Sequence, residues 1–264
     1  MKLSIVIPAR NEAGNIVTTI TRLRDYLDAH DLHDFEVLVV DDGSSDDTGD
    51  LVRAEHEKDQ RLWVARNDGK HGFGRAVTYG LDRFTGDAVI IYMADASDSP
   101  EYVVHYYYIL RDEADCAFGS RWIKGSQVID YPRFKLVINR MANAFIQLLF
   151  GLGYNDVTNA FKGYRRNVID GCRPFLSPHF NLTIELPLKA HVRGYSYKVV
   201  PISWHNRRVG VSALKLQEQG SRYLYTLLTV WFEYLLVRGD HRRPDGEAFS
   251  PWIDEPTISE GEAK

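Results

Sequence analysis

The chain has 264 residues, of which 44% are hydrophobic and 26% charged, and its formal net charge is −4. A chain of this length buries a sizeable core, as one large domain or two small ones. The negative charge and the lack of a sustained basic run argue against a nucleic-acid-binding protein. Only two cysteines occur, Cys116 and Cys172, far apart in sequence. A disulfide framework or a zinc site is therefore not expected, and a reducing compartment fits.

Strand and helix patterns alternate up to about residue 120. Short β-branched, apolar runs predict buried strands at residues 3–7, 35–40, 61–65, 87–92 and 115–119. Polar, helix-compatible stretches lie near residues 13–29, 46–58, 73–84 and 100–112. The alternation predicts an α/β fold with a mostly parallel, doubly wound sheet flanked by helices.

Polar residues follow the first two predicted strands. The first leads into Pro8-Ala9-Arg10-Asn11-Glu12, and the second into Asp41-Asp42-Gly43-Ser44-Ser45-Asp46. Open α/β sheets bind ligands outside the carboxyl ends of their strands, so these loops are candidate site loops. We favour a functional role for Asp41 and Asp42, because a carboxylate buried without a partner is costly. For the three residues Ser44–Asp46, helix capping is the favoured alternative.

The loop after the third strand reads Asn67-Asp68-Gly69-Lys70-His71-Gly72-Phe73-Gly74-Arg75-Ala76. Glycines at positions 72 and 74 allow the backbone to approach a pyrophosphate, and Lys70 and Arg75 place positive charge beside it. A Gly-x-Gly pattern is weak evidence by itself, and an ordinary loop is the alternative. The position of this loop next to the other strand ends supports a functional interpretation.

The fourth strand leads into the loop Tyr92-Met93-Ala94-Asp95-Ala96-Ser97-Asp98-Ser99-Pro100-Glu101. Pro100 predicts the first turn of a helix, which places Asp95 and Asp98 in a strand-to-helix turn. Two carboxylates three residues apart are able to share a divalent cation with the phosphates of a ligand. The alternative is a helix cap and a solvated acid.

Two later segments are amphipathic. Polar residues recur every four positions between Phe134 and Phe150, and few polar residues interrupt the apolar run between Arg222 and Val237. The second helix, at roughly 24 Å, is too short to cross a hydrocarbon layer of roughly 30 Å. We expect it to lie in a membrane interface. Burial in the core or in an oligomer interface is the alternative.

Seven segments in order support a family resemblance. They are Ile7–Glu12, Val40–Asp46, residues 93–101, Gly119–Arg121, Asn139–Asn143, Asp156–Tyr164 and Asn206–Ser212. The chain resembles the family 2 glycosyltransferases of the GT-A fold, and within them the dolichyl-phosphate mannose synthase group of polyprenyl-phosphate glycosyltransferases. The resemblance covers about residues 3–216. It implies transfer of a hexose, mannose or glucose, from a GDP or UDP sugar to a polyprenyl phosphate, with inversion and with Mg²⁺ or Mn²⁺.

The resemblance also implies site residues on the donor side. The donor nucleotide sugar would be held by Pro8, Ala9, Asn11, Glu12, Asp41, Asp42, Lys70, Gly72, Arg75, Ala94 and Asp95. Asp95 would bind the metal. The sequence departs from the family at Met93, where the first Asp of an Asp-x-Asp motif is usual, and Asp98 is inferred to restore the lost charge. It departs again at Ala213, where lysine is frequent.

Arginines lie downstream of the acidic loop, with no evident general base. A phosphate monoester is already ionised at neutral pH, so it needs cations for positioning rather than a base. Guanidinium groups recognise phosphate oxygens in pairs. We therefore expect the acceptor phosphate on Arg121, Arg140, Arg207 and Arg208, and catalysis by Asp95, Arg121 and Arg140. The alternatives are a soluble family 2 enzyme that glycosylates a sugar hydroxyl, and an inactive nucleotide-binding scaffold.

The expected organisation has three parts. Residues 1–216 form the catalytic domain, with a nucleotide-sugar half at about 1–120 and an acceptor half at about 121–216. Residues 217–239 form the amphipathic interface helix, and residues 240–264 an acidic disordered tail. We expect a cytoplasmic enzyme, peripheral at the inner face of the cell membrane, that is able to form a homo-oligomer.

Overall fold

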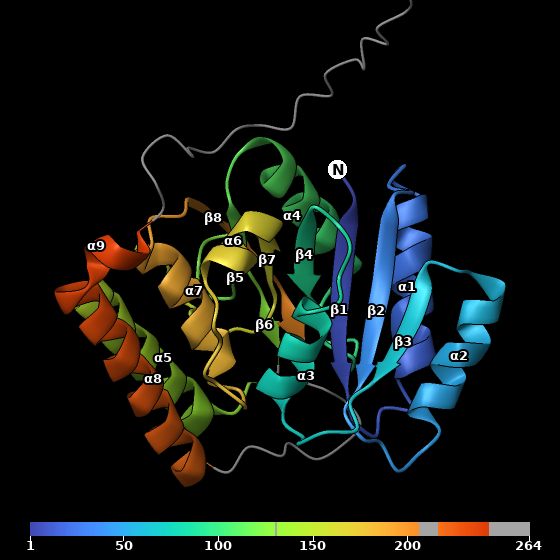
Figure 1. Cartoon of the computed structure of the whole chain (residues 1–264), viewed down its shortest axis with the longest axis horizontal. Helices are drawn as coiled ribbons and strands as arrows, with labels where there is room; N and C mark the ends of the chain where they lie inside the picture. Colours follow the sequence, from blue (N-terminus) through green and yellow to red (C-terminus); the bar gives the residue numbers. More distant parts are fainter. Residues whose placement is uncertain (130, 206–215, 243–264) are drawn as a thin grey trace, which may run out of the picture.

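The computed structural model describes residues 1–129, 131–205 and 216–242. Its main sheet has seven strands in the order β3-β2-β1-β4-β7-β5-β8. Their bounds are β1 Leu3–Ala9, β2 Phe35–Asp41, β3 Leu62–Arg66, β4 Ala88–Ile91, β5 Cys116–Ser120, β7 Lys162–Arg165 and β8 Tyr197–Pro201. Two short strands, β6 Val128–Ile129 and β9 Trp204–His205, pair separately. The mixed α/β fold with a central sheet between helices confirms the predicted fold class (Figure 1).

The helices alternate with the strands along the first half of the chain. They are α1 Ile16–Asp28, α2 Thr48–Lys58, α3 Phe73–Leu81, α4 Pro100–Asp112, α5 Arg133–Phe150, α6 Arg166–Gly171, α7 Leu182–Val192, α8 Leu216–Leu236 and α9 Arg238–His241. All five predicted strands and the four predicted helices of the first half are present, with ends shifted by a few residues. The predicted tail beyond residue 242 lies outside the described residues.

Strand β7 is the one antiparallel member of the described main sheet. It lies between β4 and β5 and runs against both, while the other neighbouring pairs are parallel. Residues 156–164 form one of the motifs of the family resemblance, and no strand was predicted there. The insertion keeps β5 from pairing with β4, and it brings the segment before β7 to the end of β5.

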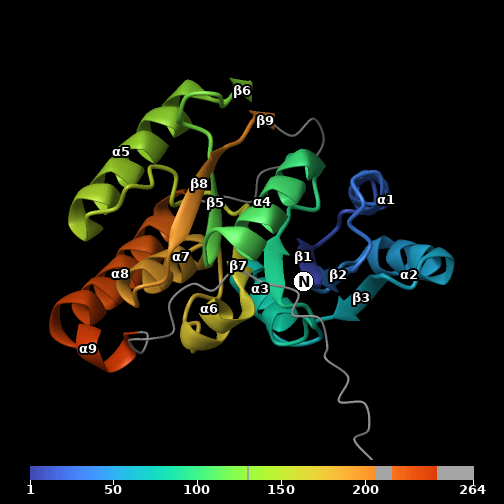
Figure 2. The same cartoon turned by 90° about the horizontal axis from the view of Figure 1, so that it is seen from above.

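Two apolar cores fill the two faces of the sheet. Side chains from α1, α2 and α4 pack on one face, and side chains from α3, α6 and α7 pack on the other. Figure 2, seen from above, shows α5 and α8 beyond the β8 end of the sheet, far from α1 and α2. The strands β1, β2 and β4 point to the same edge, at the bottom of Figure 1, where the predicted site loops begin.

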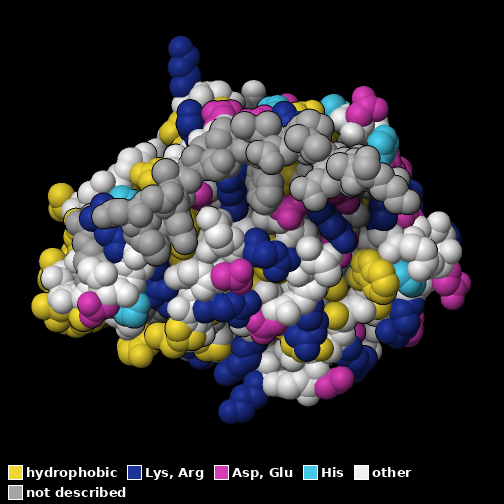
Figure 3. All heavy atoms as spheres, turned by 45° about the horizontal axis from the view of Figure 1, so that its top comes forward, with side chains coloured by type: hydrophobic (Ala, Val, Ile, Leu, Met, Phe, Trp, Pro, Cys, Tyr) yellow, Lys and Arg dark blue, Asp and Glu magenta, His cyan; other side chains and the backbone are white. Residues whose placement is uncertain are grey.

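The amphipathic helices α5 and α8 turn their polar stripes toward the protein. Asn143 of α5 and Thr226 of α8 are buried, whereas Leu148 is 84% exposed. Glu233 on the same stripe of α8 pairs with Arg193 of the segment after α7 at 2.8 Å. The exposed apolar side chains on the two helices are Phe134, Val137, Met141, Phe145, Leu148, Leu224, Tyr225, Leu228, Phe232, Leu235 and Leu236. We call this set the apolar face, and hydrophobic side chains gather along the corresponding left margin of Figure 3.

Candidate active site

The first two site loops are joined by hydrogen bonds. The Asn11 backbone N–H donates to Ser44 Oγ at 3.0 Å, and the Ser45 N–H donates to Asn11 Oδ1 at 2.8 Å. The Glu12 N–H donates to Thr48 Oγ1 at 2.9 Å. Asn11 adopts the left-handed conformation, with a φ of 55°, which is uncommon for a residue other than glycine. This conformation is compatible with the tight turn that brings the two loops together.

Pro8 and Ala9 are the last two residues of β1, and they lie in register with Val40 and Asp41 of β2. The sequence analysis placed both in the donor site, and the structure puts them at the strand edge from which the two loops leave. Because both residues are paired within the sheet, they would contact a ligand from a rigid backbone position.

Asp41 and Asp42 are both buried, as predicted, and both have partners within the protein. Asp41 Oδ1 accepts the Ser44 N–H at 2.8 Å. Asp42 accepts the Asn67 side-chain amide and the Gly72 backbone N–H, each at 2.7 Å. Asp42 therefore ties the second loop to the glycine-containing third loop. These hydrogen bonds offset most of the free-energy cost of burying the two carboxylates.

The glycines of the third loop pack against the segment before α7. A Cβ at Gly72 would lie 2.4 Å from the Pro178 carbonyl oxygen, and one at Gly74 would lie 2.1 Å from that of Ser177. The Arg75 backbone N–H donates to the Pro178 carbonyl at 3.2 Å. Close packing of two protein segments thus explains both glycines, beside the predicted approach to a pyrophosphate. The Lys70 side chain is exposed at this loop.

The acidic loop is held in place from two directions. Thr19 Oγ1 of α1 donates to the Ala94 carbonyl at 2.9 Å, and the Tyr92 hydroxyl donates to the Asp98 carbonyl at 2.5 Å. Asp95 is partly exposed, and its Oδ1 accepts the Ser97 N–H at 3.1 Å. The loop therefore contains one partly exposed carboxylate and one buried carboxylate.

The buried carboxyl of Asp98 is electrostatically frustrated. It is 4% exposed, and within the described residues its Oδ2 receives no hydrogen bond. Burial, followed by the negative charge of Asp95, raises the pKa of Asp98 to about 7. A cation bound to these two carboxylates would offset both effects, because it would give the Asp98 carboxylate a partner and neutralise the charge of Asp95.

The donor chemistry of this loop fits a hard divalent cation. Asp95 and Asp98 offer oxygen ligands, whereas Met93 offers none. No cluster of three or more His, Cys, Asp or Glu side chains suited to a metal occurs in the described part of the chain. At this loop the described residues thus supply a pair of carboxylates, and the remaining ligands would come from water and from a bound phosphate.

Arg121, directly after β5, forms a buried ion pair with Asp156. Its Nε and Nη2 donate to the two carboxylate oxygens of Asp156, each at 2.7 Å. Burial opposes the charge of Arg121, but the hydrogen bonds and the charge of Asp156 outweigh it, and the pKa of the guanidinium is raised. Arg121 also acts electrostatically on Asp98, lowering its pKa. It therefore contributes to the site through a pair rather than as an isolated cation.

Arg140, on α5, is placed differently. Its Nη1 donates to the Asn155 carbonyl at 3.2 Å, and its Cζ lies 5.4 Å from the centre of the Trp122 ring. In contrast to Arg121, it has no carboxylate within ion-pair distance among the residues that the structure describes. A guanidinium held by a carbonyl and an aromatic ring keeps donors for an anion.

Strand β7 begins with a buried lysine that the sequence pattern did not single out. Lys162 is fully buried, and its ammonium donates to the carbonyls of Val157, Asn159 and Thr183. Burial lowers the pKa of Lys162 to about 7. Lysine is seldom buried, so an apolar neighbourhood such as Ala-Phe-Lys-Gly-Tyr was the available signal. These hydrogen bonds of Lys162 stabilise the segment that contains Asp156.

Thr158, in the segment before β7, accepts hydrogen bonds from Asn139 and Asn143 of α5, at 2.8 and 3.1 Å. These contacts attach α5, and with it Arg140, to the segment that holds Asp156. Arg207 and Arg208, also predicted to bind the acceptor phosphate, lie outside the described residues.

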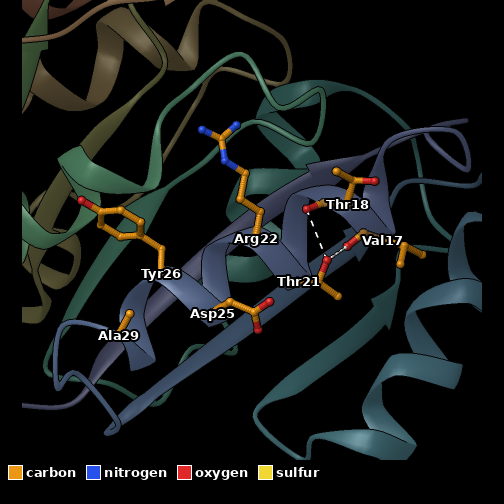
Figure 4. A pocket seen from close by; sticks show the side chains of 7 residues that line it. All are labelled: Val17, Thr18, Thr21, Arg22, Asp25, Tyr26 and Ala29. Carbon is orange, nitrogen blue, oxygen red and sulfur yellow. Dashed lines mark hydrogen bonds between the residues drawn. The ribbon is translucent and has the colours of Figure 1, made fainter.

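A shallow groove on α1 is separate from these loops. It is lined by Val17, Thr18, Thr21, Arg22, Asp25, Tyr26 and Ala29, all from the helix or its C-terminal end (Figure 4). None of the predicted site residues lines it. The site is therefore defined by the loops at the strand ends and not by this groove.

Comparison with known proteins identifies the family of the chain. The model of the glycosyl transferase family 2 matches residues 4–172. Over 216 residues, 80% of each chain, the sequence is 32% identical to polyprenol monophosphomannose synthase of Mycolicibacterium smegmatis. It is 28% identical to undecaprenyl-phosphate mannosyltransferase of Micrococcus luteus over 221 residues, 81% of this chain and 88% of the relative.

The fold has solved counterparts. Glucosyl-3-phosphoglycerate synthase from Mycobacterium tuberculosis, in complex with Mn²⁺, UDP and glucosyl-3-phosphoglycerate, superposes with a TM-score of 0.65 at 20% identity, covering 87% of this chain and 79% of that one. Its complex with Mg²⁺ and UDP gives a TM-score of 0.66. The fold and the family match define an enzyme of the glycosyltransferase class with a GT-A-type fold. The chain belongs to glycosyl transferase family 2.

Proposed function

We propose that the enzyme transfers a hexose, mannose before glucose, from a nucleotide sugar to a polyprenyl phosphate, with inversion at the anomeric carbon. Mannose is preferred because both named relatives transfer mannose to a polyprenyl phosphate according to their names. The observation that carries the proposal is the position of Arg140. It is a guanidinium without a carboxylate partner in the described chain, on a helix whose outer side is apolar.

Support for a nucleotide-sugar donor comes from the joined loops at the strand ends. Asn11, Asp41, Asp42 and Gly72 belong to one hydrogen-bonded unit that is fixed before any ligand arrives. A preorganised set of amides and carboxylates is suited to a base, a ribose and a diphosphate. In our proposal this unit, with Pro8, Ala9, Glu12, Lys70, Arg75 and Ala94, holds the donor.

The proposed reaction is a direct displacement. An oxygen of the acceptor phosphate attacks the anomeric carbon, the bond from that carbon to the nucleoside diphosphate breaks, and the configuration inverts. Arg140 holds the acceptor phosphate, and Arg121 with Asp156 fixes the end of β5 beside it. No proton has to be removed from the nucleophile, since a phosphate monoester is ionised at neutral pH.

A divalent cation, Mg²⁺ or Mn²⁺, held by Asp95 and Asp98 would stabilise the negative charge of the departing diphosphate. Both ions occur with UDP in the solved structures that share the fold. Asp95 would supply the accessible ligand, and Asp98, whose Oδ2 has no hydrogen-bond partner among the described residues, would add a second carboxylate. The positive charge of Arg121 acts on the same carboxyl.

The apolar face is proposed to rest on the lipid bilayer that carries the acceptor. None of the described helices is long and apolar enough to cross a membrane. The exposed Arg133 and Lys135 flank the apolar side chains at the start of α5. Basic residues beside an apolar face match a bilayer with anionic phosphate headgroups. The proposed location is therefore peripheral, at the cytoplasmic side of the membrane.

The test of the proposed function is a panel assay. Purified protein is incubated with GDP- and UDP-sugars, Mg²⁺ or Mn²⁺, and either a short polyprenyl phosphate or free oligosaccharides, and products are identified by mass spectrometry. We expect a glycosyl polyprenyl phosphate, formed best from GDP-mannose, and no elongated oligosaccharide. Elongation of the oligosaccharide alone would refute the proposal, because it would place the acceptor among sugar hydroxyls.

A further inference from the structure

Three aromatic side chains meet, and one of them, Trp122, lies beside Arg140. The rings of Trp122 and Tyr131 have centroids 5.7 Å apart at 78°, and those of Tyr131 and Trp204 are 5.3 Å apart at 58°. Trp122 follows β5, Tyr131 precedes α5, and Trp204 lies in β9. We call these three residues the aromatic cluster. Three distant segments of the chain therefore converge on one small surface.

The aromatic cluster does not serve the interior of the domain. All three side chains are partly exposed, and none belongs to either of the two apolar cores. The Trp122 Nε1–H is shielded from solvent, yet it has no hydrogen-bond partner among the described residues. A buried indole N–H without a partner carries a desolvation cost. Core packing therefore does not account for the cluster.

Arg140 and Trp122 are positioned by the same residue. The Asn155 carbonyl accepts Arg140 Nη1, and the Asn155 side-chain amide donates to the Trp122 carbonyl at 3.2 Å. The Ser120 hydroxyl in turn donates to Asn155 Oδ1 at 2.6 Å. These bonds hold the guanidinium at 5.4 Å from the indole centre. An anion bound at Arg140 would thus have an aromatic surface next to it.

The aromatic cluster is also adjacent along the chain to the apolar face. Tyr131 lies two residues before α5, and the exposed Phe134 and Val137 follow on that helix. A ligand with a charged head and a hydrocarbon tail would pass from Arg140 over the cluster to the exposed apolar side chains. A free sugar phosphate has no such tail, and an aromatic surface leading to an apolar face suits hydrocarbon better than a hydroxylated ring.

We propose that the aromatic cluster is the binding site for the first isoprene unit of the acceptor, with the acceptor phosphate on Arg140. This inference rests on the proposed function, which it deepens. Branched prenyl groups pack against aromatic rings through their methyl and C–H groups, and a straight alkyl chain fills the same surface less completely. The cluster therefore makes the enzyme prefer a prenyl phosphate to a straight-chain alkyl phosphate.

The experiment compares geranyl phosphate with decyl phosphate as acceptors. For Trp122→Leu and Tyr131→Leu we expect the KM for geranyl phosphate to rise about tenfold, so that the preference over decyl phosphate is lost. The KM for the nucleotide sugar should stay unchanged. The conservative variant Trp122→Phe, which retains a ring, should keep most of the preference. Trp63→Leu, at an exposed tryptophan on β3, is the matched control and should behave as the unaltered protein.

Binding of geranyl phosphate is measured separately by titration calorimetry, which does not require turnover. If no sugar reaches any prenyl phosphate but binding still falls in Trp122→Leu, the proposed function fails and the aromatic site stands. Unchanged KM and binding in Trp122→Leu and Tyr131→Leu would overturn the aromatic site while the proposed function stands. A raised donor KM with an unchanged acceptor KM would also overturn it, because the cluster would then contact the transferred sugar. Should Trp122→Leu fail to fold, Trp204→Leu gives the same decision.

Discussion

The residues proposed to hold the donor and those proposed to hold the acceptor, in the two predicted halves of the chain, differ in how their charges are compensated. In the donor half, Asp41 and Asp42 are buried, and backbone and side-chain amides satisfy them. In the acceptor half, Arg140 has no acidic partner within the described residues, and neighbouring helices expose apolar side chains. The hydrogen-bonded unit around Asp41 and Asp42 is preorganised before a ligand binds. The Arg140 guanidinium and the exposed apolar side chains, in contrast, gain partners only when a ligand binds. In our proposal, the donor site is therefore formed before the ligand binds, whereas the acceptor and the membrane that carries it complete the other site.

Asp95 is the partly exposed carboxylate of the acidic loop, and its removal should have the largest effect. For Asp95→Ala we expect transfer to fall about 10³-fold or more, because the accessible metal ligand is lost. Steady-state assays at several Mn²⁺ concentrations check this. Asp98→Ala should retain more activity and show a weaker dependence on the metal. Asp25→Ala, an exposed acid on α1, is the control. Full activity of Asp95→Ala would remove the metal assignment.

The two arginines offer a direct test of paired against unpaired charge. Arg121→Ala should cost about 3–5 kcal/mol of unfolding free energy, because it leaves Asp156 buried without its partner. Arg140→Ala should cost less than about 0.5 kcal/mol of unfolding free energy, yet raise the KM for a prenyl phosphate about 100-fold. Urea unfolding and acceptor kinetics measure the two effects. Equal losses of stability in both variants would contradict the distinction.

Lys162 predicts a pH dependence of stability. Its pKa in the folded protein is about 7, below the ordinary value of 10.5. The unfolded chain therefore binds more protons between these values, so stability should rise as pH increases from about 7 toward 10 and be lost as pH falls to about 7. The slope is at most about 1.4 kcal/mol per pH unit.

The rise of stability with pH should be absent from Lys162→Met and present in Lys124→Met, which changes an exposed lysine and serves as the control. Thermal or urea unfolding at pH 7, 8 and 9, run in parallel on the three proteins, provides the comparison. The same slope in Lys162→Met and in the unaltered protein would mean that other groups cause the pH dependence.

The apolar face should give the smallest effect of the four. Met141→Glu and Phe232→Glu place a charge on each of its helices and should weaken sedimentation with anionic vesicles about tenfold. Trp63→Glu, at an exposed aromatic residue on β3, should not change it. Unaltered vesicle binding, together with a loss of dimers in ultracentrifugation, would assign the face to a second copy of the chain.

Much of the donor half could be predicted from the sequence, because its signals are local. The β-branched runs at residues 3–7 and 35–40 and the polar residues directly after them indicate strands and site loops without any tertiary information. The structure confirms those strands as β1 and β2 and brings their loops together. The roles of the individual loop residues in binding remain predictions.

The acceptor half depends on pairings that no local pattern contains. Arg121 and Asp156 are 35 residues apart, and their ion pair exists because β7 enters the sheet antiparallel beside β5. Spacing predicted that residues 134–150 form an amphipathic helix, but it did not determine which side of the helix faces the protein. Thr158 receives Asn139 and Asn143, so the polar side points inward and the apolar side outward.

The most direct test of the account is to offer the enzyme two acceptors that differ only in the phosphate. Geranyl phosphate and geraniol are incubated with GDP-mannose and Mn²⁺, and the products are weighed by mass spectrometry. The account predicts a mannosyl phosphate ester from geranyl phosphate alone, formed about 100-fold less efficiently by Arg140→Ala at limiting acceptor. A mannoside of geraniol, formed as readily as the phosphate product, would contradict it, because the nucleophile would then be a hydroxyl.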